Sequence, residues 1–231
     1  ARGLGRFRTN IFQQRGSLAI VMRRIKETIL SFEDLHLPPV MRSISEIRQG
    51  LVLVTGTTGS GKSTTLASMI EYINTHRRVH IVTIEDPIEF LHSDKKSIIE
   101  QREIIIDTES FDTALRSMMR QDPDVILIGE MRDHITFQAA ISAAETGHMV
   151  FSTLHTSDAP QTIDRIVDLF PNNQHDQVRS ALVLNLKAIV CQRLISRSDG
   201  TGRVPGCEVM LTTPAIKECI KQNEIERIHT A

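Results

Sequence analysis

Short runs of consecutive apolar residues recur along the chain and alternate with segments of helical periodicity. Val125–Ile128 and Met149–Leu154 show no regular polar alternation, which is typical of strands that are buried on both faces of a parallel sheet. The predicted strands are Leu51–Thr55, Val79–Ile84, Val125–Ile128 and Met149–Leu154, and the predicted helices are Lys62–Asn74, Phe111–Arg120, Ile135–Glu145 and Ala159–Leu169. This alternation of strands and helices favours an α/β fold.

The two ends of the chain follow other patterns. Residues 6–29 alternate loosely and break at Gln13–Gly16, which predicts a β-hairpin. Beyond residue 175 we expect a long helix from Asp176 to Cys191, two short strands and a last helix after Pro214. The two short strands are expected around Arg193–Ser196 and Cys207–Leu211.

These patterns predict a division of the chain into three parts. Residues 1–29 are interpreted as the end of a separate N-terminal domain, residues 30–39 as a linker that contains two prolines, and residues 40–231 as the main domain. A short helix, Val40–Arg48, is expected to lead into the main domain and to end at Gly50. Since the first residue is Ala, we expect the chain to begin inside a longer protein.

Charge and composition limit the classes of protein to which the chain can belong. The net charge is −1, but residues 1–50 hold nine Lys or Arg and four Asp or Glu, whereas the remainder holds 18 and 24. Aromatic residues make up only 4% of the chain, which disfavours a stacking surface for single-stranded nucleic acid. The chain contains no run of about 18 consecutive apolar residues, so the sequence predicts no membrane-spanning segment. Three cysteines without a C-x-x-C pair disfavour a structural zinc site and fit a reducing compartment.

The strongest chemical signal follows the first predicted strand of the main domain. Residues 56–63 have the pattern G-x-x-x-x-G-K-[ST] and open a helix, which is the context that a phosphate-binding P-loop requires. Glycines allow successive N–H groups to point into one concavity, Lys62 is expected to reach the β- and γ-phosphates, and the Ser63 hydroxyl to ligate Mg²⁺. The predicted nucleotide-binding residues are Gly56, Thr57, Thr58, Gly59, Ser60, Gly61, Lys62, Ser63 and Thr64.

Candidate catalytic residues follow other apolar strands. Glu130 comes after Val125–Ile128 and Gly129, and we expect this strand to lie beside the P-loop strand, in the pattern called Walker B. We interpret Glu130 as the base or water-orienting residue and Glu85 as assisting through Mg²⁺ or water. His155 follows Met149–Leu154 and is placed to hydrogen-bond a γ-phosphate, whereas His148 precedes that strand and is expected at the opposite edge of the sheet.

Four segments in this order resemble the Walker A, Asp, Walker B and His boxes of the type II/IV secretion ATPases, and within that family the retraction ATPases of type IV pili. They are Val54–Thr65, Ile84–Glu89, Arg120–Asp133 and Gly147–Thr156. The resemblance implies a RecA-like P-loop core with a parallel-rich sheet, preceded by the end of a PAS-like N-terminal domain.

The resemblance also implies an activity and its partners. It implies a homohexameric motor that uses Mg²⁺ and ATP to power pilus retraction and twitching motility. Such a motor is cytoplasmic and peripheral at the inner membrane, acts on an inner-membrane platform protein, can work with a paralogous pilus ATPase, and binds no nucleic acid. Glu130, Glu85 and His155 match the family's catalytic positions, and Arg6 and Arg8 match arginines that close over the nucleotide.

One stretch departs from the retraction ATPases. Residues 215–222 match their Ala-Ile-Arg-Asn-Leu-Ile-Arg-Glu segment, but Glu218 and Cys219 replace the Asn and Leu. An accessory retraction paralogue therefore remains an alternative. A pilus-assembly or type II secretion ATPase is a second alternative, although such proteins carry a zinc module of C-x-x-C pairs that this chain lacks.

Other classes of P-loop protein predict other features of the sequence. A RecA-like nucleic-acid motor predicts a basic, aromatic surface, and a small-molecule kinase predicts an Arg-rich lid. A regulatory module that never hydrolyses nucleotide would not need Glu130 and Glu85. The charge asymmetry suggests instead that ATP draws the basic N-terminal segment onto the core and that hydrolysis releases it.

Overall fold

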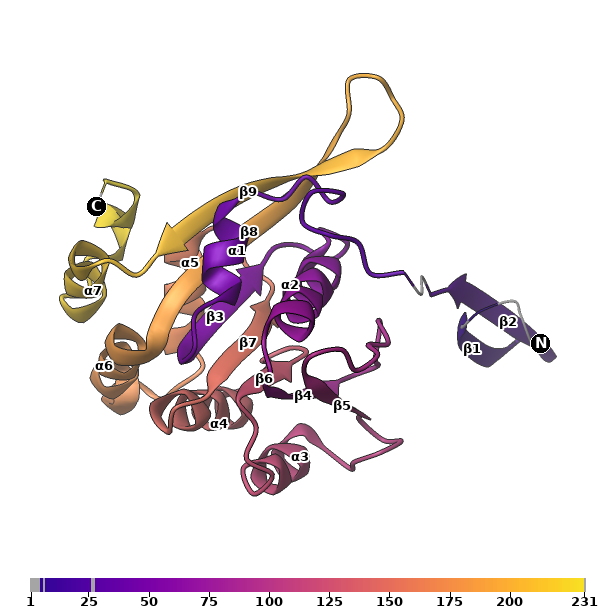
Figure 1. Cartoon of the computed structure of the whole chain (residues 1–231), viewed down its shortest axis with the longest axis horizontal. Coiled ribbons are helices and arrows are strands. Elements are labelled where there is room, and N and C mark those ends of the chain that lie inside the picture. The colour runs from indigo at the N-terminus through magenta and orange to yellow at the C-terminus, as the bar shows by residue number, and fades with distance from the viewer. Residues whose placement is uncertain (1–4, 6, 26–27, 231) are drawn as a thin grey trace.

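The computed structural model describes residues 5, 7–25 and 28–230. Its centre is a seven-stranded sheet in the order β5-β4-β6-β7-β3-β8-β9, in which only β9 runs antiparallel to its neighbour. The strands are β3 (Gly50–Thr55), β4 (His80–Glu85), β5 (Ile98–Glu103), β6 (Val125–Ile128), β7 (Met149–Leu154), β8 (Leu186–Ser196) and β9 (Arg203–Leu211). The α/β class and the parallel-rich sheet are confirmed (Figure 1).

Helices cover both faces of this sheet (Figure 1). One face packs against α1 (Val40–Ser45) and α2 (Lys62–His76), and against Phe32 and Leu37 from the segment before α1. The other face packs against the remaining helices. These are α3 (Phe111–Met118), α4 (His134–Glu145), α5 (Ala159–Val167), α6 (His175–Asn185) and α7 (Pro214–Lys221), with the short 3-10 helix η2 (Ile225–Thr230). A second 3-10 helix, η1 (Asn172–Gln174), precedes α6 and buries none of its residues.

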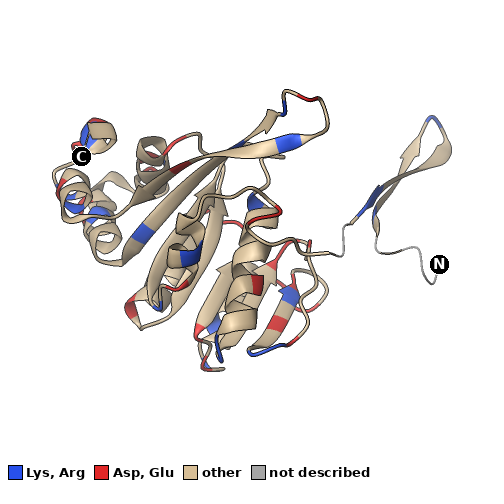
Figure 2. Cartoon of the chain, turned by 45° about the horizontal axis from the view of Figure 1, so that its top comes forward, with Lys and Arg blue, Asp and Glu red and all other residues tan. Residues whose placement is uncertain are grey.

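Alternate residues of each central strand enter the two cores. On β3, Leu51 and Leu53 belong to one core, and Val52 and Val54 to the other. This double burial explains why the central strands are continuous apolar runs. Charged residues lie mostly outside the central strands, and the edge strand β5 carries three of them (Figure 2). The sequence analysis did not predict β5, because its polar residues break the apolar pattern.

The segment after α6 corrects the predicted long helix. The helix ends at Asn185, and residues 186–191 form the first half of β8 instead. Leu186 to Cys191 pair in parallel with β3, and their side chains are mostly buried. Pairing with a central strand overrode a local sequence that is compatible with a helix. The predicted short strands are parts of the longer β8 and β9, which form an antiparallel ribbon.

The N-terminal hairpin is confirmed. Strands β1 (Phe7–Gln14) and β2 (Ser17–Arg24) pair antiparallel across a turn at Arg15–Gly16, and they project from the body of the molecule (Figure 1). Ile11 faces Ile20 across this ribbon, and both are more than half exposed. That the hairpin ends a PAS-like domain, and that residues 30–39 are a linker, stay predictions.

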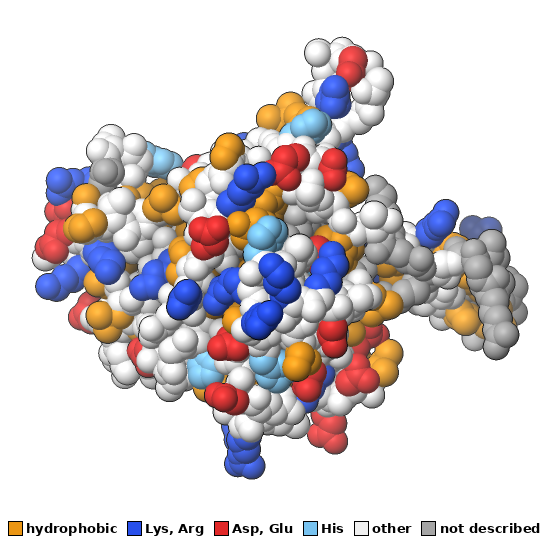
Figure 3. Space-filling view, in the orientation of Figure 1, with side chains coloured by type: hydrophobic (Ala, Val, Ile, Leu, Met, Phe, Trp, Pro, Cys, Tyr) orange, Lys and Arg blue, Asp and Glu red, His pale blue; other side chains and the backbone are white. Residues whose placement is uncertain are grey.

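The surface of the body carries mixed charge. On the face drawn in Figure 3, Lys and Arg side chains gather near the centre with Asp and Glu around them. Within the described ranges, none of the helices combines the length and the apolar character that crossing a bilayer requires.

Candidate functional site

The P-loop occupies the turn between β3 and α2. Gly56, Gly59 and Gly61 all have positive φ, at 143°, 79° and 94°. A Cβ at Gly56 would collide with the backbone oxygen of Gln192, and a Cβ at Gly61 would lie 2.7 Å from the Gln192 amide nitrogen. Only glycine satisfies both the backbone angles and the lack of space.

The loop and the start of α2 form a cradle that fits an anion. Gly61 is the N-cap of α2 and has no side chain to occupy the first N–H groups of the helix. These N–H groups and the helix dipole favour a negatively charged ligand. The buried Ser60 hydroxyl has no hydrogen-bond partner among the described residues. A phosphate would supply acceptors for these donors.

Lys62 lies at the base of this cradle. Lys62 is only 8% exposed. Its Nζ donates to the carbonyl oxygens of Gly56 at 2.8 Å and Thr57 at 3.2 Å. Burial lowers the pKa of Lys62, while the charges of Glu130 and Glu89 act to raise it. The carbonyl oxygens of the P-loop therefore hold the ammonium group at the base of the cradle.

His155 joins Lys62 to Glu130. Its Nδ1 lies 3.4 Å from Lys62 Nζ, and its Nε2 lies 3.1 Å from Glu130 Oε1. Since an ammonium group can only donate, Nδ1 accepts from Lys62, which leaves the ring proton on Nε2, the nitrogen that lies close to Glu130. The three predicted residues therefore form one connected group.

The order of the strands explains this bridge and corrects one expectation. Glu130 follows β6, which we expected beside the P-loop strand β3, but β7 lies between β6 and β3. His155 follows β7 and so stands between the two groups that it contacts. His148 lies at the opposite edge, as expected, because its carbonyl accepts from the N–H of Gly50 at the start of β3.

Arg132 contacts the other carboxylate oxygen of Glu130, Oε2. Its Nε donates to Glu130 Oε2 at 2.9 Å, and another guanidinium nitrogen lies 3.9 Å from Asp86 Oδ2. Both carboxylate oxygens of Glu130 thus have a partner. The sequence analysis did not single out Arg132, although it lies two residues after Glu130 in the segment that resembles the Walker B box.

Glu85 lies apart from this connected group. It accepts hydrogen bonds from the Thr83 hydroxyl at 2.8 Å and from the Gln101 amide at 3.4 Å. Burial raises the pKa of its carboxyl group, and these two hydrogen bonds oppose that effect. Gly129 lets the ends of β4 and β6 approach each other, since its Cβ would lie 3.3 Å from Glu85 Cα. Among the described residues, the side-chain hydrogen bonds of Glu85 reach Thr83 and Gln101 but not Lys62, His155 or Glu130. Its catalytic role stays a prediction.

A groove of about 460 Å³ runs beside the P-loop. Gly61, Thr64 and Thr65 line one side, and residues from β8, β9 and the segment before α1 complete it. Asp34 and His36 come from the segment before α1, Gln192 from β8, Arg203 from β9 and Arg197 from the turn between these two strands. The groove is large enough to continue a phosphate site with an uncharged or aromatic portion of a ligand.

The proposed magnesium ligand is Ser63, the second residue of α2. Among the described residues, no three His, Cys, Asp or Glu side chains are arranged to hold a metal ion. Mg²⁺ usually keeps water and binds through one or two protein groups together with phosphate oxygens, so a single hydroxyl beside an anion cradle fits this ion.

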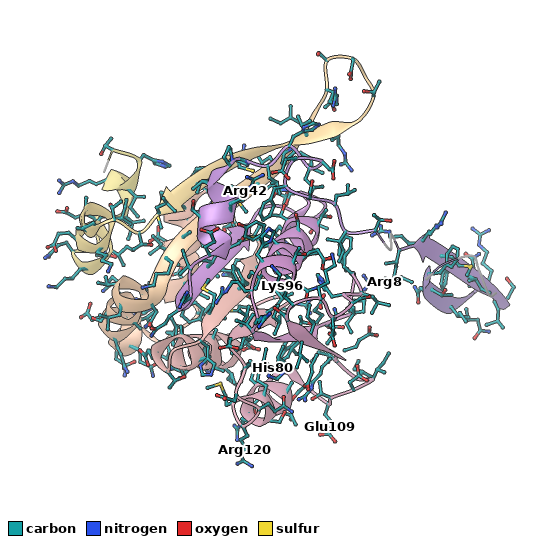
Figure 4. The ribbon with its side chains drawn as sticks, in the orientation of Figure 1. Arg8, Arg42, His80, Lys96, Glu109 and Arg120 are labelled. Carbon is teal, nitrogen blue, oxygen red and sulfur yellow. The ribbon has the colours of Figure 1, made fainter. Side chains whose placement is uncertain are left out.

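The N-terminal arginines lie elsewhere. Arg6 falls outside the described residues. Arg8, at the base of the hairpin (Figure 4), lines a cavity of about 190 Å³ with Pro87, Glu89 and Phe90. These residues follow Glu85 and Asp86, so Arg8 faces the same loop as the candidate acids. Contact between either arginine and a nucleotide stays a prediction.

Two relatives cover almost the whole chain. The twitching motility protein of Neisseria gonorrhoeae is 52% identical over 98% of this chain and 61% of its own length. The type IV pilus retraction ATPase PilT of Pseudomonas aeruginosa is 49% identical over 99% of this chain and 66% of its own length. The chain therefore spans about three fifths to two thirds of the length of these relatives.

A solved structure and a family match agree with these relatives. The crystal structure of the pilus retraction motor PilT with bound ADP is 51% identical, with a TM-score of 0.96 over 100% of this chain and 67% of that chain. Residues 6–230 match the family described as type II/IV secretion system protein. With nearly every residue inside this match, the chain belongs to the type II/IV secretion system protein family.

Proposed function

We propose that this chain is the ATP-hydrolysing part of a motor that powers retraction of type IV pili. The observation that carries this proposal is the connected group Lys62–His155–Glu130 at the P-loop, because it joins a phosphate-binding lysine to a candidate base. The relatives named for twitching motility, and PilT with its bound ADP, support both the nucleotide and the pilus.

The cradle at residues 56–63 is the proposed site of the ATP phosphates. Lys62 would exchange the carbonyls of Gly56 and Thr57 for phosphate oxygens, and the orphan hydroxyl of Ser60 would gain an acceptor. The groove beside Thr64 is the proposed site of the nucleoside. Ser63 would hold Mg²⁺, which, when bound, neutralises charge that develops on the phosphates.

Glu130 is the proposed base that orients or deprotonates the attacking water. In this structure its two oxygens are engaged by His155 and Arg132. These two contacts therefore compete with an attacking water for the carboxylate oxygens of Glu130. His155 also contacts Lys62, so movement of Lys62 toward a phosphate is the event that would weaken the His155–Glu130 contact.

The proposed movement takes place in the assembled protein. The family resemblance supports a hexamer that is peripheral at the inner membrane and acts on a platform protein there. We propose that ATP draws the basic N-terminal segment toward the core. Arg8 already lies against the loop that follows Glu85, which supports this direction of movement.

The second candidate function is an accessory retraction motor. Helix α7 carries both departures from the retraction ATPases, and they differ in burial. Cys219 is buried in the core and keeps an apolar contact, whereas Glu218 is exposed and changes the outer face of the helix. An altered outer face favours a changed partner contact rather than a changed fold.

Complementation tests the choice between these functions. The full-length protein that contains this chain would be expressed in cells that lack their retraction motor, and pilus retraction would be followed under the microscope. Restored retraction supports the main proposal. Retraction only when a second pilus ATPase is present supports the accessory motor, and phosphate release without any retraction contradicts both.

A further inference from the structure

Gln192 supports the P-loop from strand β8. It lies on β8, one residue beyond Cys191, where the pairing of β8 with β3 ends. At this point β3 turns away into the P-loop while β8 continues straight as the ribbon with β9 (Figure 1). Gln192 is therefore the first residue of β8 that lies beside the loop instead of beside β3, while it still pairs with Cys207 of β9.

The side chain of Gln192 holds two parts of the loop at once. Its amide nitrogen donates to the Ser60 carbonyl at 2.7 Å, and its amide oxygen accepts from the Thr65 hydroxyl at 2.8 Å. Gln192 and Thr65 are almost completely buried, at 3% and 1% exposure. Buried hydrogen bonds of this kind are expensive to lose, because each leaves a polar group without water.

The two anchor points flank the residues that would bind phosphate. Ser60 precedes Gly61, and Thr65 lies in the first turn of α2, so Lys62 and Ser63 are contained between them. Gln192 also limits the space at two glycines: its backbone oxygen would collide with a Cβ at Gly56, and its side-chain amide nitrogen would lie 2.7 Å from a Cβ at Gly61. Gln192 thus packs closely against the whole loop.

We propose that Gln192 is a positioning residue for the P-loop: its amide fixes the Ser60 carbonyl and the first turn of α2 so that the loop amides converge on a phosphate. This inference rests on the proposed nucleotide binding. It adds a residue more than 100 positions away in the sequence, and it makes the β8–β9 ribbon a structural support of the nucleotide site.

The chemistry of the amide gives a test that separates positioning from general stability. Gln192→Met keeps the length of the side chain and removes both hydrogen bonds. Gln192→Glu keeps the acceptor for Thr65 but, when ionised, directs a negative charge at the Ser60 carbonyl. When protonated, the same carboxyl group regains an O–H donor toward that carbonyl.

The experiment measures ADP affinity by fluorescence, and the melting temperature without nucleotide, between pH 6 and pH 8. We expect Gln192→Met to bind ADP about tenfold more weakly at every pH, which is the effect of losing a buried hydrogen bond. Gln192→Glu should bind weakly at pH 8 and recover relative to the unaltered protein as the pH falls. A role in stability alone would change the melting temperature with pH but leave the ADP affinity of the folded protein unchanged.

Two further variants complete the design. Thr65→Val removes one anchor and keeps the other, so its loss of affinity should be smaller than that of Gln192→Met, and it provides the test if Gln192→Met does not fold. Gln49→Met is the matched control, because the Gln49 amide donates to the Ala144 carbonyl at 3.2 Å at the opposite edge of the sheet. Its ADP affinity should not change.

The outcomes distinguish this inference from the proposed function. Unaltered ADP affinity in Gln192→Met, or a pH profile of Gln192→Glu that parallels that of the unaltered protein, would overturn the role of Gln192 alone. Failure of the unaltered protein to bind ADP would overturn the proposed function and this inference with it.

Discussion

The imidazole of His155 stands between Lys62 and Glu130, with its Nε2 3.1 Å from Glu130 Oε1 and its Nδ1 3.4 Å from Lys62 Nζ. The contact links a group that would sense phosphate to a group that would activate water. Any ligand that draws Lys62 away from His155 also changes the environment of Glu130.

Replacing Lys62 with Ala is expected to abolish measurable nucleotide binding or turnover. The substitution removes the buried ammonium that the cradle directs at the phosphates, and no other cation is contained in residues 56–63. Titration calorimetry with ADP measures the effect. Lys96→Ala is the control, since Lys96 is exposed and lies away from the P-loop (Figure 4). ADP binding at unchanged affinity in Lys62→Ala would sink the assignment of the P-loop.

Replacing Glu130 with Gln is expected to preserve ATP binding and slow turnover by ~10²–10⁴-fold, the usual contribution of a general base. The amide has nearly the same shape but cannot take a proton from water. Phosphate release and ATP binding are measured on the same preparation. Glu109→Gln, at an exposed position near α3, is the control and should turn over normally. Normal turnover in Glu130→Gln would contradict its role as the base.

Replacing His155 with Ala tests whether His155 acts through Glu130. We expect slower turnover in the single variant and no further loss when Glu130→Gln is added, because residues that act as a unit are not additive. The four proteins of the double-mutant cycle are compared by phosphate release. If the two effects multiply fully, His155 acts independently of Glu130 and the bridge has no catalytic meaning.

Replacing Glu85 with Gln is expected to stabilise the fold at neutral pH. Burial raises the pKa of Glu85 above its usual value, so the folded protein holds this proton more tightly than the unfolded chain does. The resulting stability is present below the unfolded pKa, near ~4.3, and is lost as the pH rises through the folded pKa.

Thermal unfolding from pH 4 to pH 8 measures this effect. Glu85→Gln should melt at a higher temperature than the unaltered protein at pH 8, and the difference should shrink toward pH 4. The hydrogen bonds from Thr83 and Gln101 can still be accepted by the Gln oxygen. A lower melting temperature for Glu85→Gln at pH 8 would mean that these bonds to the carboxylate outweigh its burial.

Some features of this protein were determined by the sequence alone. The P-loop could be predicted because its shape depends on glycines at positive φ and on a helix that begins at Lys62, and both are local properties. Glu130 and His155 could be chosen because each follows an apolar strand, and the carboxyl ends of parallel strands meet at one edge of a sheet.

Only the tertiary structure decided which of these residues touch. Strand order is a long-range property, and the position of β7 between β3 and β6 placed His155 as a bridge. Residues 186–191 have an apolar pattern that fits a helix or a buried strand, and pairing with β3 selected the strand. The same pairing brought Gln192 against the P-loop, and the packing of the ends of β4 and β6 brought Arg132 near Asp86. Contacts between segments that lie far apart in the chain depend on how the whole sheet assembles, which no local pattern of residues specifies.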